Sequence, residues 1–303
     1  MKVVSIKSAS KFFLFFLFSS LMLTGCRPIS RSPETNQPQP GTGSIYPVLL
    51  GQDETRRERA LETWNTITRA QGISNAPAPT LHPVTGAIVS LPQPSNQPFL
   101  LPKVGEGVPM REDEIRESLR RFLKDGGALL CGSSPQQLSL TERTDETDGT
   151  KRAVYQQQIF RYPLRGDFGK IEIVFKASRQ IIGIKSMCLP YSETLQRMIS
   201  ELRPNSEITP ESLVAKIKGQ TVTIKNEDGS ATVETITVNN ENEINVQELV
   251  VYSQETTSNS TGIELHLAWA VKLSNKAMAY YDAQTGNLLA ATAIRVLSSV
   301  TSN

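Results

Sequence analysis

The spacing of apolar side chains along the chain alternates between the period of a helix and the period of a strand. In the first helical stretch Leu61, Trp64, Ile67 and Ala70 fall on one face, and Gly72 can end the helix. The same kind of spacing predicts three further helices, at residues 111–126, 191–203 and 209–219.

Apolar and polar residues alternate in most of the remaining stretches, which is the pattern of half-buried strands. The clearest is GIELHLAWAVKL at residues 262–273, where every second side chain is apolar. Shorter runs predict a hairpin at 221–238 and strands at 137–141, 152–164, 169–175, 180–186, 246–254, 277–282 and 287–296. The sequence therefore predicts an α+β fold with two modules of helix and antiparallel sheet, at residues 111–190 and 191–303.

A Pro-rich segment at residues 75–109 interrupts the pattern with eight prolines. Proline has no backbone N–H and a fixed φ, so this density is incompatible with a helix or a central strand. We expect the segment to be extended along a surface, with a small hairpin that turns at Thr85 and Gly86. With the preceding helix it makes a region at residues 51–110, ahead of the two modules.

The beginning of the chain has the pattern of an export signal. Lys2, Lys7 and Lys11 precede the twelve-residue run FFLFFLFSSLML, which is too short to span a bilayer but typical of a signal peptide. The run leads into Leu-Thr-Gly-Cys, which resembles the lipobox of bacterial lipoproteins. The resemblance implies that residues 1–25 are removed and that Cys26 is acylated. An ordinary signal peptide with an unrelated cysteine is the alternative.

The lipobox also bears on location and charge. Residue 27 is arginine and not the aspartate that retains many lipoproteins in the inner membrane, so the resemblance favours the outer membrane or the cell surface. Residues 26–50 are expected to be a flexible tether, because most of them show no periodic apolar pattern.

The net charge of +2 includes the three signal lysines, and their removal leaves −1. No basic run remains that would bind nucleic acid.

Two cysteines remain after Cys26, and these are Cys131 and Cys188. An exported compartment is oxidising, so we expect the two to form a disulfide, with two buried thiols as the alternative. Neither has a histidine near it in the sequence, which argues against a metal site.

The sequence contains few groups that suggest catalysis. Its two histidines, His82 and His266, do not have the spacing of the His-Glu-x-x-His zinc motif, and the Gly-x-Ser-x-Gly elbow of serine hydrolases is absent. His266 alternates with Leu265 and Leu267 along its strand, so we expect it to face solvent. The sequence therefore predicts no catalytic residue, no metal and no cofactor.

Two stretches resemble modules from the pro-segments of secreted metallopeptidases. AWAVKLSNKAMAYYDAQTGNLLAAT, at residues 268–292, resembles the last strands of a PepSY domain. VYQQQIFRYPLRGDFGKIEIVFKASRQIIGIKS, at residues 154–186, is similar to the fungalysin/thermolysin propeptide (FTP) module. Asp282 and Gly286 delimit a turn in the first stretch, where aspartate can bind the turn amides and glycine can adopt a positive φ. We expect this turn to be a structural element and not an active site.

The resemblance implies modules that inhibit a secreted metallopeptidase or assist its folding. Because the sequence lacks the zinc motif of such a peptidase, we expect the modules to act on a separate enzyme. An exposed sheet edge or the Pro-rich segment would bind it. The expected protein is a non-catalytic envelope lipoprotein, held at the lipid membrane through Cys26. The alternative is a structural or adhesion scaffold, for which the partner would be another envelope protein.

Overall fold

The computed structural model describes residues 46–92, 98–107, 109–130, 132, 134–190, 192–225, 234–256 and 261–294. All of them belong to one compact unit, Ser44–Asn303. The expected signal peptide, its acceptor Cys26, and Cys131 lie outside the described residues. None of the described helices is both long and apolar enough to cross a membrane.

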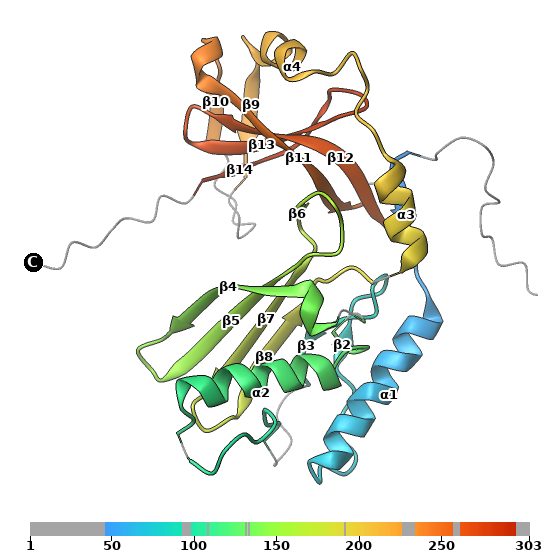
Figure 1. Cartoon of the computed structure of the whole chain (residues 1–303), viewed down its shortest axis with the longest axis vertical. Helices are drawn as coiled ribbons and strands as arrows, with labels where there is room; N and C mark the ends of the chain where they lie inside the picture. The colour runs from blue at the N-terminus through green and yellow to red at the C-terminus, as the bar shows by residue number, and fades with distance from the viewer. Residues whose placement is uncertain are drawn as a thin grey trace, which may run out of the picture. The chain divides into compact units, whose positions relative to one another are not determined.

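The fold is α+β, and its first sheet has four antiparallel strands in the order β4-β5-β7-β8 (Figure 1). These strands are β4 (Leu138–Asp145), β5 (Thr150–Gln157), β7 (Lys170–Lys176) and β8 (Ile181–Ser186). Two helices accompany the sheet, α1 (Glu54–Ala70) and α2 (Glu112–Asp125). In the Pro-rich segment, β2 (Thr80–Leu81) pairs with β3 (Ile88–Ser90) across a turn in which Gly86 has a φ of 69°. The predicted small hairpin is therefore present.

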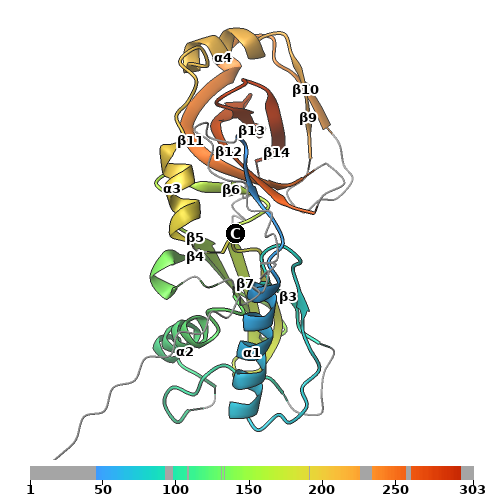
Figure 2. The ribbon, with the colours of Figure 1, turned by 90° about the vertical axis from the view of Figure 1, so that its right-hand side faces the viewer.

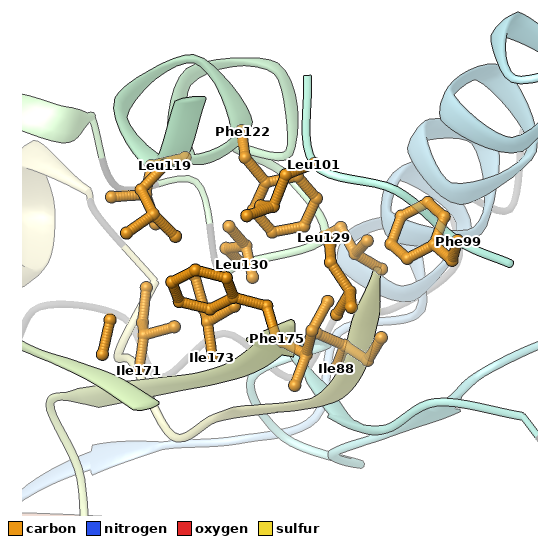
Figure 3. Packing of buried hydrophobic residues seen from close by; sticks show 14 of the residues in the cluster. Ile88, Phe99, Leu101, Leu119, Phe122, Leu129, Leu130, Ile171, Ile173 and Phe175 are labelled. Carbon is orange, nitrogen blue, oxygen red and sulfur yellow. The ribbon is translucent and has the colours of Figure 1, made fainter. Parts of the chain in front are cut away.

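One hydrophobic core joins α2 to a face of this sheet (Figure 3). The buried apolar residues of α2 have the helical spacing of the predicted helix at 111–126, and these are Ile115, Leu119, Phe122 and Leu123. The residues of β7 that face them are Ile171, Ile173 and Phe175. Burial of each such side chain stabilises the fold by about 1.5–3 kcal/mol, so this alternation determines which face of β7 carries the helix.

The helix and Pro-rich segment that precede the first module are not a separate linker, because they share this core. The ring of Phe99 packs between Trp64 and Phe122, with centroid separations of 5.0 and 6.0 Å. The amide of Leu101 donates a hydrogen bond of 2.8 Å to the carbonyl of Arg179, at the turn between β7 and β8. The described residues around Leu100 thus run extended along the first sheet, as predicted for the Pro-rich segment.

The second sheet has the order β14-β13-β12-β11-β6, and β1 also pairs with β12. Its strands are β1 (Val48–Leu50), β6 (Leu164–Gly166), β11 (Ile244–Glu255), β12 (Ile263–Leu273), β13 (Ala277–Asp282) and β14 (Leu288–Ala293). The elements around it are α3 (Glu193–Glu201), α4 (Pro210–Ile217) and the paired strands β9 (Thr221–Ile224) and β10 (Glu234–Thr237). Figure 2 shows how strongly the long strands β11 and β12 curve.

The helices of the second half begin where the sequence predicts. The hydroxyl of Ser192 accepts a hydrogen bond of 3.0 Å from the Leu195 amide and caps α3. Thr209 caps α4 in the same way, with Pro210 in the first turn, where a missing N–H costs nothing.

The strand predicted at residues 152–164 is interrupted in the structure. β5 ends at Gln157, whose buried side-chain amide binds the carbonyl and the amide of Leu189 at 2.8 and 2.9 Å. The chain then leaves the first sheet, and β6 runs parallel to β11 in the second. Gly166 permits this approach, since a Cβ there would lie 2.1 Å from the carbonyl oxygen of Ser253. Alternation alone does not indicate which sheet a strand joins.

The tether expected at residues 26–50 ends earlier than predicted. Its last three residues form β1, which pairs antiparallel with residues 263–265 of β12, and Val48 is buried. A strand of three residues is too short for alternation to identify it in the sequence.

Candidate interaction groove beside strand β8

β8 is the last strand of the first sheet, and it presents a large aliphatic side chain to solvent. Ile181 and Ile184 are buried in the core, whereas Lys185 is exposed and Ile182 keeps 44% of its surface accessible. Ile182 and Gly183 follow one another between the two core residues because the pairing of β7 with β8 shifts register at this point.

A groove of about 380 Å³ lies beside the outward face of β8. Residues 89–92, at the end of β3, line one side, and residues 182–185 with Val174 and Glu172 of β7 line the other. Among the described residues, backbone pairing on the outer edge of β8 is confined to its start, where the Ile181 amide donates to the Phe99 carbonyl at 2.8 Å. In the described residues β3 belongs to a separate ladder and does not pair with β8.

A row of alternating charges crosses the outward face of the first sheet and reaches this groove. Arg152 binds Glu142 at 2.6 Å on one side and Glu172 at 3.0 Å on the other. The hydrogen bond with Glu172 is the main cause of the raised pKa of Arg152. Lys185 stands directly opposite Glu172 in the β7–β8 register, and no ion pair joins it to any described residue. The row thus ends in an exposed cation at the groove.

The edges at β4 and β14 are better protected. Along β4, Glu142 pairs with Arg152, Arg143 with Glu112 and Asp145 with Lys151, and a register shift interrupts the ladder. β14 is covered at its end by Lys225, which exchanges backbone hydrogen bonds of 3.0 and 3.2 Å with Ala291 and Ala293. Of these three edges, the one at β8 is the most suitable for binding an extended segment.

The expectation that His266 faces solvent is wrong. Only 7% of His266 is exposed, and its Nδ1 lies 2.8 Å from Oδ2 of Asp282. Nε2 lies 3.3 Å from Oε2 of Glu264. Ala268 and Ala270, which follow it on the same face of β12, are also buried, so both faces of the strand are covered over this stretch. Alternation identifies two faces but does not show that one of them is solvated.

The buried carboxylate of Asp282 is the centre of a polar network. Tyr46, just before β1, donates to its Oδ2 at 2.8 Å, and the amides of Gln284 and Thr285 donate to Oδ1 at 2.8 and 2.9 Å. Burial alone raises the pKa of Asp282, but the hydrogen bonds from His266, the Thr285 amide and Tyr46 hold it below its usual value. Burial first, and then the charge of Asp282, raise the pKa of Tyr46, so this phenol remains a neutral donor.

This network lacks the parts of a catalytic triad. Among the described residues no serine or cysteine hydrogen-bonds to His266, and its second nitrogen faces Glu264. His82 is also buried, and its Nδ1 accepts hydrogen bonds from the amides of Val84 and Thr85 in the β2–β3 turn. His82 therefore organises the backbone of this turn, whereas His266 binds the carboxylates of Asp282 and Glu264. The network can attach the start of the folded unit to the turn after β13.

The turn from Asp282 to Gly286 has the geometry that its sequence suggests. Gly286 has a φ of 69°, and its carbonyl accepts a hydrogen bond of 2.6 Å from Nζ of Lys216 on α4. A Cβ at Gly286 would lie 3.1 Å from Ile208. The turn is thus packed against its own module.

The pairing of Cys131 with Cys188 stays a prediction, since only Cys188 lies within the described residues. Cys188 is buried, and burial raises the pKa of its thiol to about 12. The hydroxyl of Ser186 donates to the carbonyl of Leu130 and accepts from the Cys188 amide, both at 3.4 Å. The residue that precedes Cys131 in the chain therefore lies close to Cys188.

The sequence analysis did not single out the residues of the groove. A sequence feature that could have indicated the groove is present in QIIGIKS. There Ile182 and Gly183 interrupt the alternation of a strand, and Lys185 follows. It becomes specific only when β3 and residues 91–92, in the middle of the Pro-rich segment, are placed beside β8.

Comparison with known proteins adds a remote structural likeness. No family model and no curated protein matches the chain. Among solved structures, the Bacillus megaterium YpeB C-terminal domain is similar with a TM-score of 0.34 and 11% sequence identity, over 78% of this chain and 97% of that domain. A likeness this remote leaves the family open, and the resemblance to PepSY and FTP modules stays a proposal.

Proposed function

We propose that the protein is a non-catalytic lipoprotein of the cell envelope whose propeptide-type modules bind a secreted metallopeptidase and inhibit it or assist its folding. In this proposal the lipid on Cys26 holds the protein at the membrane, with the outer membrane favoured. The folded unit Ser44–Asn303 carries the binding surface.

The groove beside β8 is the observation that supports a binding function. It combines the two features expected of a docking surface here, a sheet edge and part of the Pro-rich segment. Addition of an extended segment at such an edge is a common means of recognition, because the backbone supplies the affinity and the side-chain pockets supply the specificity. A partner bound there would need no catalytic group from this chain.

A peptidase assay tests this proposal. The purified unit Ser44–Asn303 is added in increasing amounts to the secreted proteins of the producing cell, and hydrolysis of labelled casein is followed with and without a chelator. We expect the chelator-sensitive activity to fall in proportion to the added protein, or its recovery after denaturation to rise. Added trypsin serves as a control, and its activity should not change.

Two results would contradict the proposal. If a tenfold excess changes neither the chelator-sensitive activity nor its recovery, the scaffold interpretation is favoured. If the isolated unit itself hydrolyses peptides, esters or glycosides, and one substitution abolishes the turnover, the protein is an enzyme.

A further inference from the structure

The groove beside β8 has a hollow where one side chain is missing. Gly183 lies on the outward face between Ile182 and Lys185, and Val174 is opposite it on β7. A Cβ at Gly183 would lie 3.6 and 3.7 Å from two atoms of Val174, which is ordinary contact distance. The position therefore has space for a larger side chain, and among the described residues only Val174 comes within 4 Å of it.

The surroundings of the hollow are apolar, and the charge at its rim is positive. The half-buried residues Val89, Leu91 and Pro92 line the side across from β8. Lys185 is the last charge in the row that runs through Glu142, Arg152 and Glu172. A strand that paired with β8 would place a side chain beside Lys185. A carboxylate is favoured there, because opposite charges on neighbouring strands attract and like charges repel.

We infer that the groove binds an extended peptide segment with an acidic residue and a large aliphatic residue two positions apart. Lys185 and Gly183 are themselves two residues apart on one face, about 7 Å along the strand. An extended partner with the same spacing places its carboxylate beside Lys185 and its aliphatic side chain over Gly183. This inference rests on the proposed function, since it describes the docking segment of the partner.

Short blocked peptides test this specificity directly. The probes are fluorescein-labelled, threonine-rich heptapeptides that contain Asp-x-Leu or Leu-x-Asp, so that both chain directions are covered. Control peptides replace aspartate by lysine or leucine by threonine. Binding to the unit Ser44–Asn303 is measured by fluorescence anisotropy up to about 1 mM, the affinity range of a short docking segment.

Two substitutions in the protein probe the two halves of the site. Gly183→Val fills the hollow at a position where valine suits a strand, and it should weaken binding at least tenfold without lowering the thermal midpoint. Lys185→Glu reverses the rim charge and should weaken binding about tenfold. Lys176→Glu is the matched control, because it makes the same charge change roughly 13 Å along β7 from Glu172, beyond the screening length.

The inference is supported if one of the acidic–aliphatic peptides binds saturably and both groove variants weaken it while the control variant does not. It is overturned if neither peptide binds, if the lysine peptide binds as well, or if a folded Gly183→Val protein binds unchanged. Should Gly183→Val fail to fold, unchanged binding by the Lys185→Glu protein overturns it instead. If peptides bind but no peptidase is affected, the proposed function fails and this inference stands. If the Gly183→Val protein inhibits a peptidase as strongly as the parent protein does, the proposed function stands and this inference fails.

Discussion

Replacement of Tyr46 by phenylalanine isolates one hydrogen bond of the buried Asp282 network. The substitution keeps the ring, which contacts His266 edge-on at a centroid distance of 5.7 Å. It removes only the hydroxyl, which donates to Oδ2 of Asp282 at 2.8 Å and lies 3.2 Å from the carbonyl of Leu267. Both acceptors belong to the second sheet, whereas Tyr46 lies at the start of the folded unit.

The expected loss follows from the charge of the acceptor. A hydrogen bond to an ionised group contributes about 1.5–3 kcal/mol to stability. Asp282 keeps three other hydrogen-bond partners, His266 and the amides of Gln284 and Thr285. Its buried carboxylate therefore stays hydrogen-bonded in the variant. We therefore expect a loss near the lower limit, about 1.5–2 kcal/mol in the free energy of unfolding.

Urea unfolding of the unit Ser44–Asn303 at pH 7 measures this loss. Tyr162→Phe is the matched control, because Tyr162 is half-buried and its hydroxyl makes no hydrogen bond to the described residues. The control should change stability by less than about 0.5 kcal/mol. Equal midpoints for the two variants would refute the assignment of a stabilising role to the Tyr46 hydroxyl.

The pH dependence of the same difference gives a second check. Because the folded pKa of Asp282 lies below its usual value of 3.8, ionised Asp282 stabilises the fold above about pH 4, and this contribution is lost as the pH falls through the folded pKa. The difference between the parent protein and Tyr46→Phe should therefore be constant from pH 5 to 7 and should decrease in more acidic solution. If the stability difference between the two proteins increased on acidification, the proposed hydrogen bond between Tyr46 and ionised Asp282 would be contradicted.

Four further changes have definite expected outcomes. Cys26→Ser should release the protein from membranes or leave its signal uncleaved, and unchanged detergent partitioning would exclude lipidation there. Reduction of a Cys131–Cys188 disulfide should lower the free energy of unfolding by about 4 kcal/mol according to the chain-entropy relation. Alkylation of both thiols in the unfolded, unreduced protein would show that the disulfide is absent. Gly286→Val should destabilise by about 1 kcal/mol or more, measured by urea unfolding, because it combines a positive φ with a close contact to Ile208. Tyr281→Phe should be neutral or stabilise by up to about 1 kcal/mol in the same assay, since the buried Tyr281 hydroxyl has no partner among the described residues.

The sequence by itself determined the elements whose physical causes are local. The face of α2 is visible as helical spacing, and the caps Ser192 and Thr209 are visible as residue types at fixed distances from an apolar run. The turn from Asp282 to Gly286 is also local, because its hydrogen bonds and its positive φ depend on residues within the turn. The α+β class followed from the order of these elements.

The tertiary structure alone decided how segments distant in the chain combine. β1 and β6 are too short to show a period, and they join the second sheet only because β12 and β11 offer unpaired edges to them. The burial of His266 depends on Tyr46, 220 residues earlier in the chain, and on cover over both faces of β12. The groove at Gly183 likewise requires β3 and β8 to be brought side by side. Periodicity reports which side chains share a face, whereas burial and a binding surface depend on what is packed against that face.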